Sequence, residues 1–302
     1  MSGSDRASAP LPDVPGVERT YREVNGVELH AVSAGDPDDP LVVLLHGFPE
    51  FWYEWRGFLD PLVEAGYRVV VPDQRGYNRS EKPDGFDAYS VDTLSADVVG
   101  LIETAGRESA HVVGHDWGAA VAWDLALRHP EVVDRLGIVN VPHPTVFQRT
   151  LTSDFAQLRN SWYMFFFQLP LLPEWVTSRN RFAFFVNAME GGSRAGTFDE
   201  QDFERYRLAW GREDAVGSMI DWYRALFRRQ REPPRERVDA PTLVVWGEND
   251  QALIPRMAEE SVQYCSDGRL ERFPDATHWV PHEYPDRVAA LLLEHLGAGA
   301  RD

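Results

Sequence analysis

Asp116 occupies the position of a hydrolytic nucleophile, inside the segment Gly-His-Asp-Trp-Gly-Ala that follows the apolar run 110–113. The pattern glycine-x-nucleophile-x-glycine is typical of a strand-to-helix turn that lifts one side chain off the end of a sheet. A serine there would indicate acyl transfer, whereas an ionised aspartate can attack saturated carbon and form an ester that water later cleaves. Asp116 could instead simply cap the helix that begins at Trp117. The first interpretation predicts a hydrolase that opens a strained or polarised C–X bond.

Cleavage of such an ester needs a histidine to activate water and an acid to orient it, in the chain order nucleophile, acid, histidine. Asp250 lies just past the apolar run 242–247, and His278 lies on a loop after the shorter predicted strand 269–273. Either residue alone could be an ordinary turn or loop residue. Because both follow strand ends in the required order, the sequence predicts a triad of Asp116, Asp250 and His278.

The segment His46-Gly47-Phe48-Pro49-Glu50 follows the predicted buried strand 41–45. A turn of this kind can aim the backbone N–H of Phe48 into the site, where it would hold a negative oxygen together with the N–H of Trp117. The alternative is an ordinary Gly-Pro loop. Glu50 and His115, which belong to the same two motifs, are candidates for positioning water or for structural hydrogen bonding.

The elements that carry these motifs alternate along the chain. Asn25-Gly26 separates two strand-like runs at 20–24 and 27–32 and predicts a β-hairpin. After the hairpin the sequence predicts strands at 41–45, 67–71, 110–113 and 135–139 and helices at 51–65, 91–105 and 117–128. Apolar strands that alternate with helices indicate a parallel sheet covered on both faces.

Between 145 and 235 the strand signals give way to an aromatic, arginine-rich helical pattern, which predicts a cap over the strand ends. The sheet resumes near Leu243, and an amphipathic helix at 285–296 follows. The predicted organisation is a flexible tail at 1–16, a core domain at 17–144 and 236–302, and a helical cap at 145–235.

Taken together, these motifs resemble the epoxide hydrolases of the α/β-hydrolase fold, over roughly Val17 to Leu296. The resemblance rests on the segments 46–50, 73–80 and 114–119 and on the spaced Asp250 and His278. It implies an α/β-hydrolase fold, with a mostly parallel eight-stranded sheet, helices on both faces and an inserted helical cap.

The cap segment carries the most discriminating part of the resemblance. Tyr163, within 162–168, and Tyr223, within 221–226, match the two tyrosine motifs of that family. Aromatic residues in so apolar a context could also be core residues. Two phenols could hold an epoxide oxygen by hydrogen bonds and donate a proton as the ring opens, and the resemblance implies that role here.

The resemblance implies an enzyme that hydrolyses a small apolar epoxide to a vicinal diol, through an ester on Asp116 and water activated by His278 and Asp250. One alternative is a haloalkane or haloacid dehalogenase with the same nucleophile. Phe48 departs from the halide-binding asparagine of many dehalogenases, and Trp117 departs from the arginine of the haloacid branch. A second alternative is a non-catalytic ligand-binding protein of the same fold, although every catalytic position is filled.

The composition limits the remaining function classes. The 302 residues, 43% of them hydrophobic, suffice for one α/β domain with an insertion. A formal net charge of −18 argues against nucleic-acid partners and anionic membrane surfaces. No apolar run approaches the ~18 residues that span a bilayer. The sequence contains neither a metal-ligand cluster nor a glycine-rich phosphate loop, so no metal or other cofactor is expected.

Cys265 is the only cysteine, which excludes an intrachain disulfide and favours a reducing, cytoplasmic location. Lys82 is the only lysine. The acidic, lysine-poor composition fits adaptation to high salt and fits a GC-rich genome equally well. The identity of the epoxide, the stereochemical preference and the oligomeric state are not indicated by the sequence.

Overall fold

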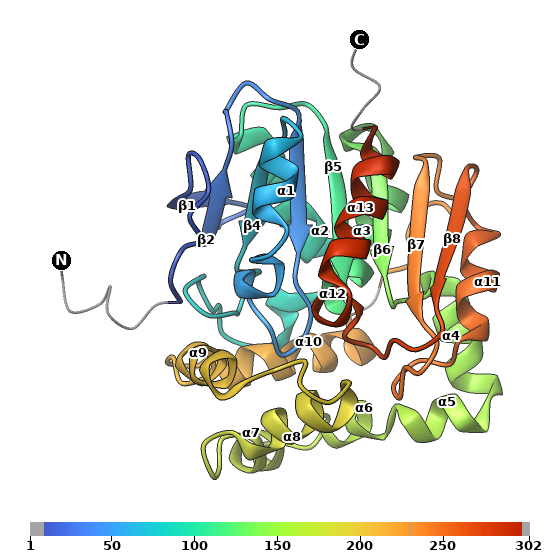
Figure 1. Cartoon of the computed structure of the whole chain (residues 1–302). Helices are drawn as coiled ribbons and strands as arrows, with labels where there is room; N and C mark the ends of the chain where they lie inside the picture. The colour runs from blue at the N-terminus through green and yellow to red at the C-terminus, as the bar shows by residue number, and fades with distance from the viewer. Residues whose placement is uncertain (1–8, 230, 298–302) are drawn as a thin grey trace.

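An eight-stranded sheet with helices on both faces forms the core of the computed structural model (Figure 1). The structure describes residues 9–229 and 231–297. The strands are β1 (Glu18–Val24), β2 (Val27–Ala34), β3 (Leu41–Leu45), β4 (Arg68–Pro72), β5 (Ala110–His115), β6 (Val133–Val139), β7 (Thr242–Gly247) and β8 (Gly268–Phe273). Their order is β1-β2-β4-β3-β5-β6-β7-β8, antiparallel up to β4 and parallel beyond it. The predicted mostly parallel eight-stranded sheet is confirmed.

The strand order reverses at β3, which lies between β4 and β5. In an open parallel sheet, connections on the two sides of such a point leave a crevice beyond the carboxyl ends of the strands, where ligands bind. All five residues of β3 and all five of β4 are buried, as expected for strands covered on both faces. The topology therefore places the loops after β3 and β5 at the expected ligand crevice.

The predicted hairpin is present, with Val24 paired to Val27 across a two-residue turn. Both turn residues have positive φ, 46° at Asn25 and 77° at Gly26. Asparagine and glycine tolerate this conformation better than other residues, which explains why this dipeptide signals a hairpin.

The core helices are α1 (Leu59–Glu64), α2 (Val91–Thr104), α3 (Trp117–Arg128), α11 (Arg256–Val262), α12 (Val280–Glu283) and α13 (Pro285–Leu296). The single helix predicted over 51–65 was wrong, because the segment forms the short 3-10 helix η2 (Trp52–Trp55) and then α1. Pro61 has no N–H to donate to residue 57, so a helix that started at 51 could not continue unbroken through this position. Helix α1 instead begins at Leu59, which places Pro61 in its first turn.

Seven helices between β6 and β7 form one helical insertion: α4 (Pro144–Ser153), α5 (Phe155–Asn160), α6 (Trp162–Phe166), α7 (Leu172–Thr177), α8 (Ala183–Gly192), α9 (Glu200–Trp210) and α10 (Ala215–Arg228). Figure 1 shows most of these helices at the bottom of the view, beyond one end of the strands. The indole N–H of Trp210 donates to the carbonyl of Pro49 at 2.6 Å, and that of Trp222 to the carbonyl of Arg75 at 3.0 Å. The insertion therefore lies over the loops that follow the carboxyl ends of β3 and β4.

The predicted flexible tail covers residues 1–16, of which 1–8 lie outside the described residues. Ala9 and Val14 are buried, and the backbone N–H of Gly35 donates to the carbonyl of Pro15 at 3.0 Å. The last part of this segment is therefore packed against the end of β2. Across the described residues, no helix has both the length and the apolar character needed to cross a membrane.

Candidate active site

Asp116 lies at a sharp turn between β5 and α3, with a positive φ of 49°. We refer to Gly114–Gly118 as the elbow. A Cβ at Gly114 would approach the carbonyl oxygen of Gly118 to 2.3 Å, and one at Gly118 would approach that of Leu45 to 2.2 Å. The Asp116 side chain makes no capping hydrogen bond to α3, so the helix-cap alternative is not supported. The elbow holds the carboxylate away from the helix and toward the crevice.

The two carboxylate oxygens of Asp116 have different partners. Oδ1 accepts a hydrogen bond from the backbone N–H of Phe48 at 2.7 Å. Oδ2 lies 3.4 Å from Nε2 of His278. The segment His46–Glu50, which we call the oxyanion loop for the role predicted for it, thus reaches Asp116 as the sequence suggested. Trp117 begins α3, and the part assigned to its backbone N–H stays a prediction.

Asp250 and His278 follow β7 and β8, and the structure brings His278 to Asp116 and Asp250 to His278. Nδ1 of His278 lies 2.7 Å from Oδ2 of Asp250. Oδ1 of Asp250 accepts the backbone N–H groups of Ala252 at 2.7 Å and Leu253 at 3.0 Å, which fixes the carboxylate. The three side chains have the arrangement of a nucleophile, a base and an orienting acid.

Asn140, which follows β6, was not among the site residues predicted from the sequence. Its amide Nδ2 donates to Oδ2 of Asp250 at 2.8 Å, and its Oδ1 accepts the N–H of Gly247 at 2.9 Å. Its backbone has a positive φ of 49°. The available signal was a polar residue at the end of an apolar strand, the same signal that identified Asp250. Asn140 holds the orienting carboxylate from the neighbouring strand.

Electrostatics favour an ionised Asp116 next to a protonated His278. Burial raises the pKa of Asp116, but the hydrogen bond and charge of His278 and the Phe48 N–H more than offset this, and the net pKa is lowered. Burial lowers the pKa of His278, whereas the charge of Asp250 and the contact with Asp116 raise it to about 9. The nucleophile is therefore charged at neutral pH.

Tyr163 on α6 and Tyr223 on α10 lie over the nucleophile, with ring centroids 5.8 Å apart. Burial, together with the nearby charge of Asp116, raises the pKa of both phenols, and for Tyr223 the neighbouring Tyr163 contributes as well. The ring of Tyr223 also lies edge-on to that of Trp117, with centroids 5.1 Å apart. Both phenols are thus protonated donors at neutral pH.

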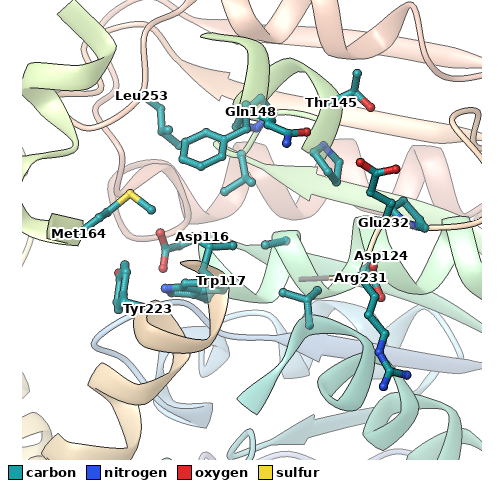
Figure 2. Close-up of a pocket in the computed structure, with 18 of the residues that line it drawn as sticks. Asp116, Trp117, Asp124, Thr145, Gln148, Met164, Tyr223, Arg231, Glu232 and Leu253 are labelled. Carbon is teal, nitrogen blue, oxygen red and sulfur yellow. The ribbon is translucent and has the colours of Figure 1, made fainter. Parts of the chain in front are cut away.

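A cavity of about 510 Å³ connects these groups to the surface. Its inner wall includes Asp116, Tyr163, Tyr223, Met164 and Phe147. Figure 2 shows Asp116, Trp117, Met164 and Tyr223 grouped at one end and Arg231 and Glu232 at the other. This volume lies within the range of pockets that hold small organic molecules. The inner end is mostly apolar and aromatic, whereas the segment 231–236, which follows the insertion, forms the polar mouth.

Glu50 and His115, the two candidates for positioning water, meet in a fully buried cluster beneath the oxyanion loop. Oε1 of Glu50 accepts the hydroxyl of Tyr206 at 2.5 Å and lies 2.7 Å from Nε2 of His282. Nδ1 of His115 lies 3.7 Å from Oε2 of Glu50. Their part in positioning water stays a prediction.

A third member of this cluster, Glu54 on η2, was not among the predicted site residues. Glu50, Glu54 and His115 each offer one atom within 4.8 Å of the others, a spacing that could hold a metal ion. Nδ1 of His115 is only 2.9 Å from Oε1 of Glu54, which is shorter than the separation of two ligand atoms around a ~2.1 Å zinc site would be. We therefore interpret the cluster as bridged by protons. Its only sequence signal was an acidic residue in the aromatic segment Trp52–Trp55.

The comparisons with known proteins all find α/β hydrolases. The sequence profile of the family described as alpha/beta hydrolase fold matches residues 40–285. The AB hydrolase superfamily protein YfhM of Bacillus subtilis is 42% identical over 281 residues, which are 93% of this chain and 98% of that protein. Epoxide hydrolase 1 of Caenorhabditis elegans is 36% identical over 286 residues, which are 93% of this chain and 70% of that protein.

A solved structure extends the comparison to three dimensions. It is a mutant epoxide hydrolase from Bacillus megaterium complexed with its naphthyloxy-propanediol product. It is 31% identical in sequence, covers 92% of this chain and 100% of its own, and has a TM-score of 0.81. With such coverage, the similarity includes both the sheet and the helical insertion.

Proposed function

The chain belongs to the epoxide hydrolases of the α/β-hydrolase fold, and on that premise we propose that it converts an apolar epoxide to a vicinal diol through a covalent ester on Asp116. One observation carries this mechanism: the ionised carboxylate of Asp116 and the two phenols line the inner end of one cavity, and the His278–Asp250 pair contacts that carboxylate from behind the cavity wall.

The first half-reaction opens the ring. Oδ1 of Asp116 is held by the Phe48 N–H, so Oδ2 is the oxygen that attacks a ring carbon. The bond between that carbon and the epoxide oxygen breaks as the ester bond forms. Tyr163 and Tyr223 hydrogen-bond the departing oxygen, and one of them gives it a proton. Their raised pKa keeps both in the O–H form needed for this step at neutral pH.

The second half-reaction cleaves the ester. Alkylation removes the negative charge of Asp116, and with it one of the causes that keep His278 protonated. The proton of His278 restores the phenol that opened the ring. The neutral His278, oriented by Asp250, then takes a proton from water, whose oxygen adds to the ester carbonyl. The oxygen that becomes negative is Oδ1, which faces the Phe48 N–H, with the Trp117 N–H as the second donor. Collapse breaks the bond between the carbonyl carbon and Oδ2, and His278 gives its proton to the departing diol oxygen. The proton of the new Asp116 carboxyl group then returns to His278, which restores the ionised carboxylate beside a protonated imidazole.

The helical insertion acts as a cap in this mechanism and defines the proposed domain limits of 17–144, 145–235 and 236–302. It contributes Tyr163 and Tyr223, and it is tied to the oxyanion loop by the Trp210–Pro49 hydrogen bond. A cover of this kind keeps bulk water from the charged nucleophile and strengthens the hydrogen bonds inside the site.

The apolar, aromatic inner wall supports a hydrophobic substrate. The naphthyloxy-propanediol product of the Bacillus megaterium relative supports an aryloxy epoxide as the first probe. The purified protein is incubated with such an epoxide and a terminal bromoalkane together, while diol and free bromide are followed. We expect diol without bromide, and no diol from Asp116→Ala. Bromide without diol would instead indicate a dehalogenase.

A second measurement tests the covalent step. The His278→Gln variant lacks the base for ester cleavage, so the intermediate should accumulate. Intact mass spectrometry of this variant after exposure to the epoxide should show an adduct equal in mass to the whole epoxide, located on Asp116. An enzyme that forms diol but never shows this adduct in the variant would contradict the covalent mechanism.

A further inference from the structure

Glu54 contacts both the oxyanion loop and His115 of the elbow, but it does not line the cavity. The side chain is buried, with 2% of its surface exposed, on the short helix η2. Oε2 accepts the backbone N–H of Gly47 at 2.8 Å. Gly47 directly precedes Phe48, whose N–H holds the nucleophile. One carboxylate oxygen of Glu54 therefore fixes the oxyanion loop.

The other carboxylate oxygen acts through His115. Oε1 lies 2.9 Å from Nδ1 of His115, and Nε2 of the same ring lies 2.9 Å from the backbone carbonyl of His278. A carbonyl can only accept, so Nε2 must carry a hydrogen. Glu54 thus links the oxyanion loop to the loop that carries the proposed base, through the residue next to the nucleophile.

This arrangement fixes the number of protons between Glu54 and His115. Because Nε2 carries a hydrogen, the close approach of Nδ1 and Oε1 at 2.9 Å requires one further proton on one of these two atoms. Without that proton, the lone pair of Nδ1 would face the Glu54 carboxylate at 2.9 Å and the Glu50 carboxylate at 3.7 Å. Like charges and lone pairs at these distances in a buried site repel strongly.

The surroundings keep this proton in place at neutral pH. Groups that titrate or carry charge around Glu54 come from the oxyanion loop, the elbow, α9, the His278 loop and α12: Glu50, His115, Asp116, Tyr206, His278 and His282. Burial and the charge of Glu50 raise the pKa of Glu54 to about 8. Burial lowers the pKa of His115, but the charges and contacts of Glu54 and Glu50 more than offset this, and the net pKa of His115 lies well above its ordinary value. The pair therefore loses its proton only at alkaline pH.

We propose that Glu54 is a positioning residue for ester hydrolysis. It fixes the oxyanion loop and the His278 loop relative to each other through one buried proton shared with His115. Loss of this proton breaks the link to the His278 loop and slows the hydrolytic half-reaction. Substrate binding is unaffected, because Glu54 is not part of the cavity wall. The inference rests on the proposed ester mechanism.

The decisive variant is Glu54→Gln. Its amide can accept the Gly47 N–H and donate permanently to Nδ1 of His115, so it mimics the protonated carboxyl. Single-turnover tryptophan fluorescence separates ester formation from ester hydrolysis. At about pH 7 we expect hydrolysis within about threefold of wild type, since the same hydrogen bonds are made. At about pH 9.5, above the Glu54 pKa, wild-type hydrolysis should fall while the variant keeps its rate.

Glu54→Ala removes both contacts. Because small misplacements of catalytic groups can cost on the order of 10²-fold, we expect a loss of hydrolysis of roughly that size with an unchanged KM for ester formation. Glu131→Gln, on an exposed residue away from the site, is the matched control and should behave as wild type at both pH values. Circular dichroism verifies that each variant folds.

An alkaline decline in Glu54→Gln equal to that of wild type would overturn the inference. So would stoichiometric metal in wild-type protein that Glu54→Gln lacks, because an ion would then occupy the place of the proton. Failure of the proposed function would look different: wild-type protein itself would form no ester on Asp116.

Discussion

At the scale of single residues, the chemistry depends on the unequal surroundings of two oxygens on one side chain. Oδ1 of Asp116 is occupied by a backbone N–H, and Oδ2 faces an imidazole. In the proposed mechanism the first oxygen later carries the negative charge of the tetrahedral intermediate and the second forms the ester. The Phe48 N–H therefore binds Oδ1 both in the free carboxylate and in the tetrahedral intermediate. No rearrangement is needed between the two, as expected of a preorganised site.

Replacement of Tyr223 by phenylalanine should slow ester formation by roughly 10²-fold, because it removes one proton donor to the epoxide oxygen. The double variant with Tyr163→Phe should lose more than either single variant. The measurement is the single-turnover rate of fluorescence change. Tyr284→Phe, on a tyrosine that packs against Phe273 and does not line the cavity, is the control. A Tyr223→Phe enzyme with the wild-type rate would contradict the assigned role.

The pKa of His278 should decrease when the charge of Asp116 is removed. The contact with Asp116 is one of the causes that raise this pKa to about 9, so Asp116→Ala should bring it closer to 6.5. Titration of the imidazole by NMR measures the shift directly. An unchanged pKa would mean that Asp250 alone sets it and that alkylation does not release the base.

The same group should make stability depend on pH. The folded-state pKa of His278 lies above its ordinary value of 6.5, so protonation stabilises the fold. This contribution is complete below 6.5 and is lost as the pH rises through about 9. The free energy of urea unfolding should therefore fall more upon His278→Gln at about pH 6 than at about pH 10. Equal losses at the two pH values would count against the raised pKa.

At this scale the sequence is a good guide to groups at strand ends and a poor guide to those that act through others. Asp116, Asp250 and His278 were identifiable because loops after parallel strands meet at one edge of the sheet. Glu54 gave no such signal, since it lies in a short 3-10 helix and its importance comes from two contacts, one of them with a residue distant in sequence. Only the folded chain brings Glu54 to His115.

At the scale of elements, the turn that carries the nucleophile depends on close backbone contacts. Gly118 lies against the carbonyl of Leu45, and Gly114 lies against Gly118. Strand β3 and helix α3 can approach this closely only because neither glycine has a Cβ. The pattern of glycines around the nucleophile thus reflects packing, in addition to the freedom of the backbone.

Two glycine substitutions should consequently have opposite effects. Gly118→Ala should destabilise the protein by at least about 3 kcal/mol, because backbone must move to admit the methyl group. Gly217→Ala, in α10 with no atom within 4 Å of the added carbon, should stabilise it by about 0.5–1 kcal/mol through helix propensity. Urea unfolding monitored by circular dichroism measures both. A stabilising Gly118→Ala would show that the elbow is looser than the structure indicates.

The elements themselves were largely predictable from the sequence. Helices 117–128 and 285–296 and strand 41–45 have the expected bounds, because their apolar periodicity is uninterrupted. The segment 51–65 was not, since its aromatic run satisfies a helical pattern while Pro61 prevents a continuous helix. In this segment the missing N–H of Pro61 outweighs the helical periodicity of the apolar residues.

At the scale of the whole molecule, the reversal of strand order at β3 gives the site its position. The oxyanion loop and the elbow follow neighbouring strands, and the helical insertion covers the loops beside them. The sequence predicts the order of these elements and the insertion between β6 and β7. It does not predict which pocket the insertion leaves, because that depends on the packing of seven short helices.

The formal charge of −18 should make the whole protein more stable in salt. As potassium chloride rises from about 0.01 M to about 1 M, the Debye length falls from about 30 Å to about 3 Å, so self-repulsion weakens. We expect the melting temperature to rise over this range, measured by differential scanning fluorimetry. A steady fall of both melting temperature and activity toward molar salt would exclude an adaptation to high salt.

The mouth of the cavity has a consequence for how such enzymes diversify. It is bordered by residues 231–236, a connection with neither helix nor strand that leaves the insertion and leads toward β7. Surface connections accept insertions and deletions far more readily than packed elements do. A lineage can therefore lengthen, shorten or recharge the entrance while the nucleophile, the phenols and the base are inherited unchanged.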